Sequence, residues 1–155
     1  MKLGFIGTGE ITKAVVIGVL GSKIKFQKIY LSKRNSKISA FLTKKSKKIQ
    51  IEKNNQDLIN KSDWVFLAVT PKVGNKIIKK LHFKRRQTIV SFISTIQLPK
   101  LKKLTKNRTN IVRAIPLPPI SLRKGPIPIF PPNKKVKRFF SNLGTVIEIN
   151  DEKKS

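Results

Sequence analysis

Short apolar runs alternate along most of the chain with segments in which apolar residues recur at three- and four-residue spacing. The runs are rich in β-branched and aromatic residues and predict strands, whereas the longer spacing predicts amphipathic helices. We expect strands at residues 3–6, 28–32, 48–51, 64–69, 88–92, 111–115, 126–130 and 145–149. We expect helices at residues 11–20, 36–45, 55–59, from Pro71 onward, 98–104 and 134–143.

This alternation predicts an α/β fold, a Rossmann-like, doubly wound, mostly parallel sheet with helices on both faces. The run 64–69 is apolar throughout, as strands buried on both faces are. Residues 116–119 are expected to form a rigid non-helical turn, and the prolines within 126–130 are expected to restrict that strand to a sheet edge. With 155 residues, we expect one domain over 1–150 and a polar tail over 151–155.

The composition excludes several classes of site. The chain has no Cys and one His, His82, so a structural zinc site, a disulfide framework and thiol catalysis are not expected, and no metal ligands are assigned. The first apolar run is interrupted at Gly7, which argues against a signal peptide. The longest run is too short to cross a bilayer, so we expect no membrane partner and a cytoplasmic location.

The chain carries 35 Lys and Arg against 7 Asp and Glu, a formal net charge of +28. Basic clusters recur in nearly every expected helix or loop, and aromatic residues do not interleave with them. We interpret the charge as a compositional bias with non-specific polyanion binding as a by-product, and expect no specific nucleic-acid partner. A basic nucleic-acid-associated protein remains an alternative.

A glycine turn, Gly7-Thr8-Gly9, directly follows the first strand and precedes a helix. In a phosphate-binding turn the first glycine permits a sharp bend, the second lets the backbone approach a pyrophosphate, and the helix directs its N–H groups at the anion. The third glycine of that motif is absent, since Thr12 occupies its place. The turn predicts a dinucleotide site, with a purely structural turn as the alternative. The candidate contacts are Ile6, Gly7, Thr8, Gly9, Glu10 and Ile11.

Ser32, Lys33 and Arg34 occupy the end of the second strand, where a carboxylate would bind the ribose 2′-hydroxyl of NAD. Residues 11–51 contain no Asp or Glu. A hydroxyl and a guanidinium suit a phosphate, so we expect NADP in preference to NAD. The alternative is chance, because the whole chain is poor in acids.

Further candidates lie where two other strands end. Ala68, Val69, Thr70 and Pro71 end the central strand at the carboxyl edge, where ligands of parallel sheets bind. Phe92, Ile93 and Ser94 follow the fifth strand and are expected on the nicotinamide side. The alternative for residues 68–71 is an ordinary connection from strand to helix without a ligand. The alternative for residues 92–94 is a loop without a binding role.

Several of these segments together resemble the N-terminal domain of pyrroline-5-carboxylate reductase, the last enzyme of proline synthesis. The matching segments are residues 7–9 with Ala14, 32–35, 62–71, 90–91, 113–116 and 142–144. The resemblance implies NADP-dependent hydride transfer to a small-molecule cyclic imine. It also implies that Asn55 contacts the cofactor, although Asn55 could instead be a helix cap. Because hydride transfer depends on positioning, no catalytic residue is assigned.

The chain departs from the family at three positions. The family usually has Lys at the position of Thr70, Gln or His at that of Lys72, and Asn at that of Leu117. Family members also continue into a helical domain that forms the dimer and holds the substrate, so we expect this chain to need that domain or a partner chain. A dinucleotide-binding module without reductase activity is the alternative.

Overall fold

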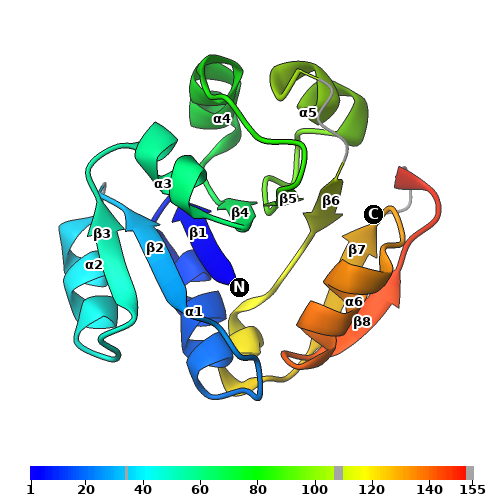
Figure 1. Cartoon of the computed structure of the whole chain (residues 1–155). Helices are drawn as coiled ribbons and strands as arrows, with labels where there is room; N and C mark the ends of the chain where they lie inside the picture. The colour runs from blue at the N-terminus through cyan, green and yellow to red at the C-terminus, as the bar shows by residue number, and fades with distance from the viewer. Residues whose placement is uncertain (34, 107–109, 153–155) are drawn as a thin grey trace.

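The computed structural model describes residues 1–33, 35–106 and 110–152. Within them, eight strands form one sheet in the order β3-β2-β1-β4-β5-β6-β7-β8 (Figure 1). The strands are β1 (Lys2–Ile6), β2 (Lys28–Ser32), β3 (Ile49–Glu52), β4 (Trp64–Leu67), β5 (Thr88–Ser91), β6 (Ile111–Ala114), β7 (Pro126–Phe130) and β8 (Thr145–Glu148). The helices are α1 (Glu10–Leu20), α2 (Ser36–Thr43), α3 (Asn55–Lys61), α4 (Pro71–Ile77), α5 (Leu98–Leu104) and α6 (Lys134–Ser141), with 3₁₀ helices η1 (Ile78–Lys80) and η2 (Pro118–Leu122).

The doubly wound fold predicted from the sequence is confirmed. All neighbouring strands are parallel except β6 and β7. One hydrophobic core joins the sheet to α1, α2 and α6, and a second joins the opposite face to α3, α5 and the end of α4. Figure 1 shows α1 and α2 behind β2 and β3, with α3 in front. Stacked rings of Phe5 and Phe66, with centroids 4.4 Å apart, lie in the first core.

The prediction that the proline-containing strand 126–130 lies at a sheet edge is wrong. β7 pairs with β6 on one side and with β8 on the other. Proline is tolerated because β6 and β7 pair at only two positions. The N–H groups that the prolines lack therefore do not break a long hydrogen-bond ladder. The carbonyl of Pro128 still accepts a hydrogen bond of 3.0 Å from the backbone N–H of Ile115. The edge strands of the described sheet are β3 and β8.

The prediction of a non-helical turn over 116–119 also needs correction, because η2 begins at Pro118. Proline fixes φ near the helical value and lacks only an N–H that the first turn leaves unpaired, so it fits the start of a helix. Ile120 of η2 is buried against the core of α1 and α6. The other element boundaries differ from the predicted ones by at most two residues, and β2, β7 and α5 have the predicted bounds. β4, for example, ends at Leu67 instead of Val69.

Candidate functional site

Two adjoining cavities open at the carboxyl ends of β1, β2 and β4, where the strand order reverses between β1 and β4. This reversal point is where parallel α/β sheets bind ligands. The first cavity, of about 510 Å³, is lined by Ile6, Gly7, Ser32, Lys33, Lys53, Asn54, Asn55, Val69 and Ile77. The second, of about 630 Å³, is lined by Gly7, Thr8, Gly9, Asn35, Ser36, Lys37, Ala68, Val69, Thr70 and Val73. Gly7 and Val69 line both, so the two cavities lie side by side.

The two glycines of the turn have different surroundings. Gly7 has φ +100°, and a Cβ on it would collide with the backbone of Ala68. Gly9 has φ −101°, which any residue adopts, and a Cβ on it would meet no atom within 4 Å. Gly7 is therefore required by the fold itself, whereas the absence of a side chain at Gly9 leaves open space beside the backbone.

A hydrogen-bond network holds the turn against β2. The N–H of Gly7 donates to Ser32 Oγ at 2.9 Å, and the hydroxyl of Thr8 donates to the Ser32 carbonyl at 2.7 Å. Thr12 replaces the third glycine of the motif, and its buried hydroxyl donates to the Gly7 carbonyl at 2.6 Å. Ser32 therefore serves the turn as well as lining the cavity, a role that the sequence did not indicate.

The N-terminus of α1 adjoins the second cavity. Gly9 is its N-cap and supplies no side-chain hydrogen bond, so the N–H groups of the first turn remain available. Together with the positive end of the helix dipole, they make a suitable environment for an anion. Glu10 is exposed at the first position of the helix. With Ile11 it lines a separate cavity between α1 and η2, away from the two described above.

The cavity walls near β2 and β3 are basic. Lys33 and Lys53 line the first cavity and Lys37 the second, and no Asp or Glu is among the described residues that line either. Glu52, at the end of β3, is 5% exposed and is bound by Lys61 Nζ at 2.7 Å. The hydrogen bond with Glu52 raises the pKa of Lys61 above its usual 10.5. This carboxylate is therefore neutralised within the protein. Arg34 lies outside the described residues.

Asn54 caps α3, accepting a hydrogen bond of 2.8 Å from the N–H of Asp57. Asn55 is the first residue of the helix and lines the first cavity. The helix-cap role considered for Asn55 thus belongs to its neighbour, and the Asn55 side chain is not used as the cap.

The end of β4 supplies the wall opposite the glycine turn. Ala68, Val69 and Thr70 line the second cavity. Thr70 is the N-cap of α4, with a long hydrogen bond of 3.5 Å from the N–H of Val73, and Pro71 follows as the first helical residue. At this wall the backbone of Ala68 and Val69 lies close to Gly7.

The three residues predicted after β5 lie outside the two cavities. The side chain of Ile93 is buried in the second core, and Phe92 packs against Phe66 with ring centroids 5.6 Å apart. Ser94 is exposed, and its carbonyl accepts a hydrogen bond from the Arg113 guanidinium. None of the three lines the two cavities.

Sequence reasoning missed several residues that line the site. Some come from β2–α2 and the loop before α3, and two come from α4: Asn35, Ser36, Lys37, Lys53, Asn54, Val73 and Ile77. Two signals were available, since Asn35 lies in a segment that matches the family and Lys53 directly follows an expected strand. The spacing of apolar residues predicted a helix that contains Val73 and Ile77, but it does not indicate which helical residues line a cavity.

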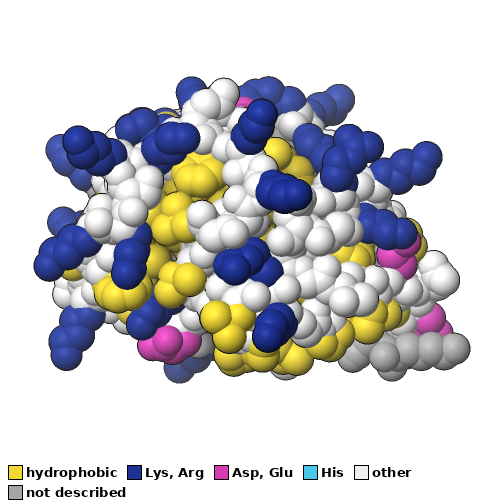
Figure 2. Space-filling view, turned by 90° about the horizontal axis from the view of Figure 1, so that it is seen from below, with side chains coloured by type: hydrophobic (Ala, Val, Ile, Leu, Met, Phe, Trp, Pro, Cys, Tyr) yellow, Lys and Arg dark blue, Asp and Glu magenta, His cyan; other side chains and the backbone are white. Residues whose placement is uncertain are grey.

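The basic side chains are dispersed. Figure 2 shows Lys and Arg spread over the upper, left and right parts of one face, with few acids among them. Over the part of the chain that the structure describes, no helix is long and apolar enough to cross a membrane. Within the same residues, no three His, Cys, Asp or Glu side chains gather as metal ligands would.

Solved structures place this arrangement among known folds. Pyrroline-5-carboxylate reductase from Streptococcus pyogenes is 22% identical, with a TM-score of 0.82 over 99% of this chain and 59% of its own. The Plasmodium falciparum pyrroline carboxylate reductase, solved with NADP bound, is 20% identical, with a TM-score of 0.81 over 99% and 58%. These likenesses establish the fold.

Sequence comparison supplies the family. Pyrroline-5-carboxylate reductase 3 of Danio rerio is 27% identical over 81% of this chain and 44% of its own length, and the Synechocystis reductase is 25% identical over 96% and 58%. The chain thus spans about half the length of these relatives, and its resemblance to them is confirmed. The family model described as "NADP oxidoreductase coenzyme F420-dependent" matches residues 2–95, more than half of the chain. The chain therefore belongs to that family of oxidoreductases.

Proposed function

We propose that this chain is the dinucleotide-binding half of an NADP-dependent reductase of the pyrroline-5-carboxylate type, acting in proline biosynthesis. The observation that carries the proposal is the adjoining pair of cavities around Gly7-Thr8-Gly9, with open space beside Gly9 at the N-terminus of α1. In a parallel α/β sheet this is the place for a dinucleotide pyrophosphate.

The residues present fit such a cofactor. Gly9 and the first turn of α1 would hold the pyrophosphate, and Ser32, Lys33 and Asn55 would surround the adenosine half. A basic wall without carboxylates favours NADP over NAD, since a carboxylate would repel the 2′-phosphate. The structure of the Plasmodium falciparum relative with NADP supports this preference.

The bound cofactor would supply a hydride, and a cyclic imine is already electrophilic. The chain's part in the reaction is therefore to hold and orient the dinucleotide and to keep its reactive end at the carboxyl edge of the sheet. The relatives are about twice as long as this chain. We propose that the groups that orient the imine belong to a second domain or to a partner chain, as the greater length of the relatives suggests.

Two measurements test the proposal. NADPH should bind to the chain with saturation, as followed by its fluorescence, and more tightly than NADH at about 150 mM salt, where the general attraction of anions is screened. A chimera carrying the remaining part of the Synechocystis reductase after residue 152 should oxidise NADPH when pyrroline-5-carboxylate is added. Absence of NADPH binding would refute the proposed site, and equal affinities would refute the NADP preference.

A second candidate is a dinucleotide-binding module without reductase activity. Leu117, 46% exposed at the start of η2, stands where the family usually has Asn. A chimera that binds NADPH but turns over no imine, while its Leu117→Asn variant does, would favour this candidate.

A further inference from the structure

Lys33 and Lys53 both line the first cavity, although they are 20 positions apart in the sequence. Their closeness follows from strand register. β2 and β3 are parallel neighbours in which Ser32 pairs with Glu52, so each lysine is the first residue beyond the end of its strand. Adjacent strands lie about 4.8 Å apart, which brings the two lysine backbones to the cavity side by side.

Among the residues that the structure describes, neither Lys33 nor Lys53 forms an ion pair, and both are exposed. The nearest carboxylate in sequence, Glu52, is bound by Lys61 and by Gln50, each at 2.7 Å. Two neighbouring cations repel each other, and a dianion between them would relieve that repulsion.

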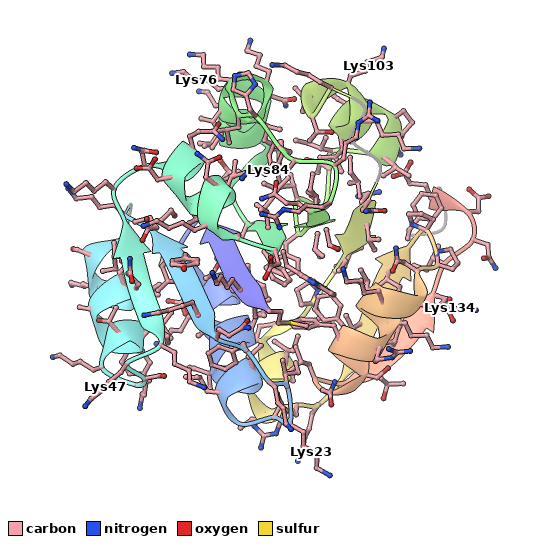
Figure 3. The ribbon with its side chains drawn as sticks, viewed as in Figure 1. Lys23, Lys47, Lys76, Lys84, Lys103 and Lys134 are labelled. Atoms are coloured by element: carbon pink, nitrogen blue, oxygen red, sulfur yellow. The ribbon has the colours of Figure 1, made fainter. Side chains whose placement is uncertain are left out.

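Unpaired lysines are common in this chain, so charge alone does not single these two out. Their position distinguishes them, because both line a cavity that Ser32 and Asn55 also line. Lys47, which precedes the other end of β3, lines neither cavity, and Figure 3 shows its side chain directed away from the body of the protein.

We propose that Lys53 is a specificity-determining residue that, together with Lys33, binds the 2′-phosphate of NADP. Discrimination against NAD then comes from the loop between β3 and α3 as well as from the end of β2. This inference rests on the proposed function, since it assigns the adenosine half of the dinucleotide to the first cavity.

The test compares Lys53→Gln with Lys47→Gln, which removes the same charge from the opposite end of the same strand. Affinities of the full chain for NADPH and NADH are measured at about 150 mM salt, and those for adenosine 2′,5′-bisphosphate and 5′-AMP alongside. We expect Lys53→Gln to weaken NADPH and the bisphosphate about fivefold, the effect of one exposed charge pair, with NADH and 5′-AMP within about twofold. Lys47→Gln should leave all four unchanged, and Lys53→Arg should retain the preference.

The outcomes separate this inference from the proposed function. If the unmodified chain binds neither dinucleotide, both are overturned. If it binds them but Lys53→Gln weakens NADPH and NADH equally, or no more than Lys47→Gln does, only the role of Lys53 is overturned. Both substitutions are at exposed positions, and thermal unfolding followed by circular dichroism verifies that each variant is folded.

Discussion

Arg113 Nη1 lies 2.7 Å from Glu152 Oε2 in the most buried ion pair of the described residues, with side chains 6% and 13% exposed. The same carboxylate oxygen accepts a hydrogen bond of 2.6 Å from the backbone N–H of Leu98 at the start of α5. Arg113 also donates to the carbonyl of Ser94. Glu152 thus joins the segment after β8 to β6, to the loop after β5 and to α5.

We expect Glu152→Ala to lower the free energy of unfolding by about 3 kcal/mol, because it leaves the Arg113 guanidinium buried without its carboxylate. Urea unfolding measures the loss. The control is Glu148→Ala, which breaks a more exposed pair with Lys137, with side chains 35% and 50% exposed, and should cost less than about 1 kcal/mol. Equal losses in the two variants would contradict the assigned importance of the buried pair.

Gly9→Val should abolish NADPH binding while the chain remains folded. The Cβ of the valine would meet no atom within 4 Å in the open space beside Gly9, and the φ of −101° there is accessible to any residue. Fluorescence titration measures binding, and the melting temperature, expected to fall by only a few degrees, verifies folding. Normal NADPH binding by this variant would show that the turn has only a structural role.

Gly7→Ala should instead destabilise the protein by about 2 kcal/mol or more, since alanine at φ +100° is strained and its Cβ would collide with the Ala68 backbone. Chemical denaturation measures the change. The opposite behaviour of these neighbouring glycines distinguishes a residue that the fold needs from one that the ligand needs. A fully stable Gly7→Ala variant would contradict the described turn.

The 155-residue chain alone should reduce pyrroline-5-carboxylate far more slowly than about 1 per second, even with saturating NADPH. No group that we identify in the described residues holds the imine against the cofactor, and poor positioning removes several kcal/mol of transition-state stabilisation. The assay follows NADPH oxidation by absorbance, with the chimera as positive control. Turnover in the ordinary enzyme range would place a substrate site within this chain, first of all around Leu117 and η2.

Much of the fold was predictable because it depends on neighbours in sequence. The apolar run 64–69 and the spacing of apolar residues in 11–20 fixed the type of each element, and Gly7-Thr8-Gly9 marked the turn between them. The edge position predicted for the strand 126–130 was wrong because that prediction also considered only neighbours in sequence. The rule about proline in strands does not include the length of the pairing with the next strand. β6 and β7 pair at only two positions, so Pro126 and Pro128 are accommodated.

The candidate site was predictable only in part. The sequence indicated Gly7, Ser32 and Val69, which line the first cavity together. It did not indicate that Ser32 accepts a hydrogen bond from the Gly7 N–H, that Asn54 caps α3 in place of Asn55, or that Phe92 packs against the core. Each of these depends on the direction of a side chain, which apolar patterning does not specify.

The sequence by itself determined the alternation of strands and helices, the glycine turn and the family, since local periodicity, backbone freedom and motif spacing are written in consecutive residues. Only the tertiary structure decided which distant residues meet: Lys53 beside Lys33 at the cavity, and Glu152 against Arg113 beneath α5. The physical reason is that such encounters follow from strand register and from the burial of charge, and both are set when the whole sheet is assembled.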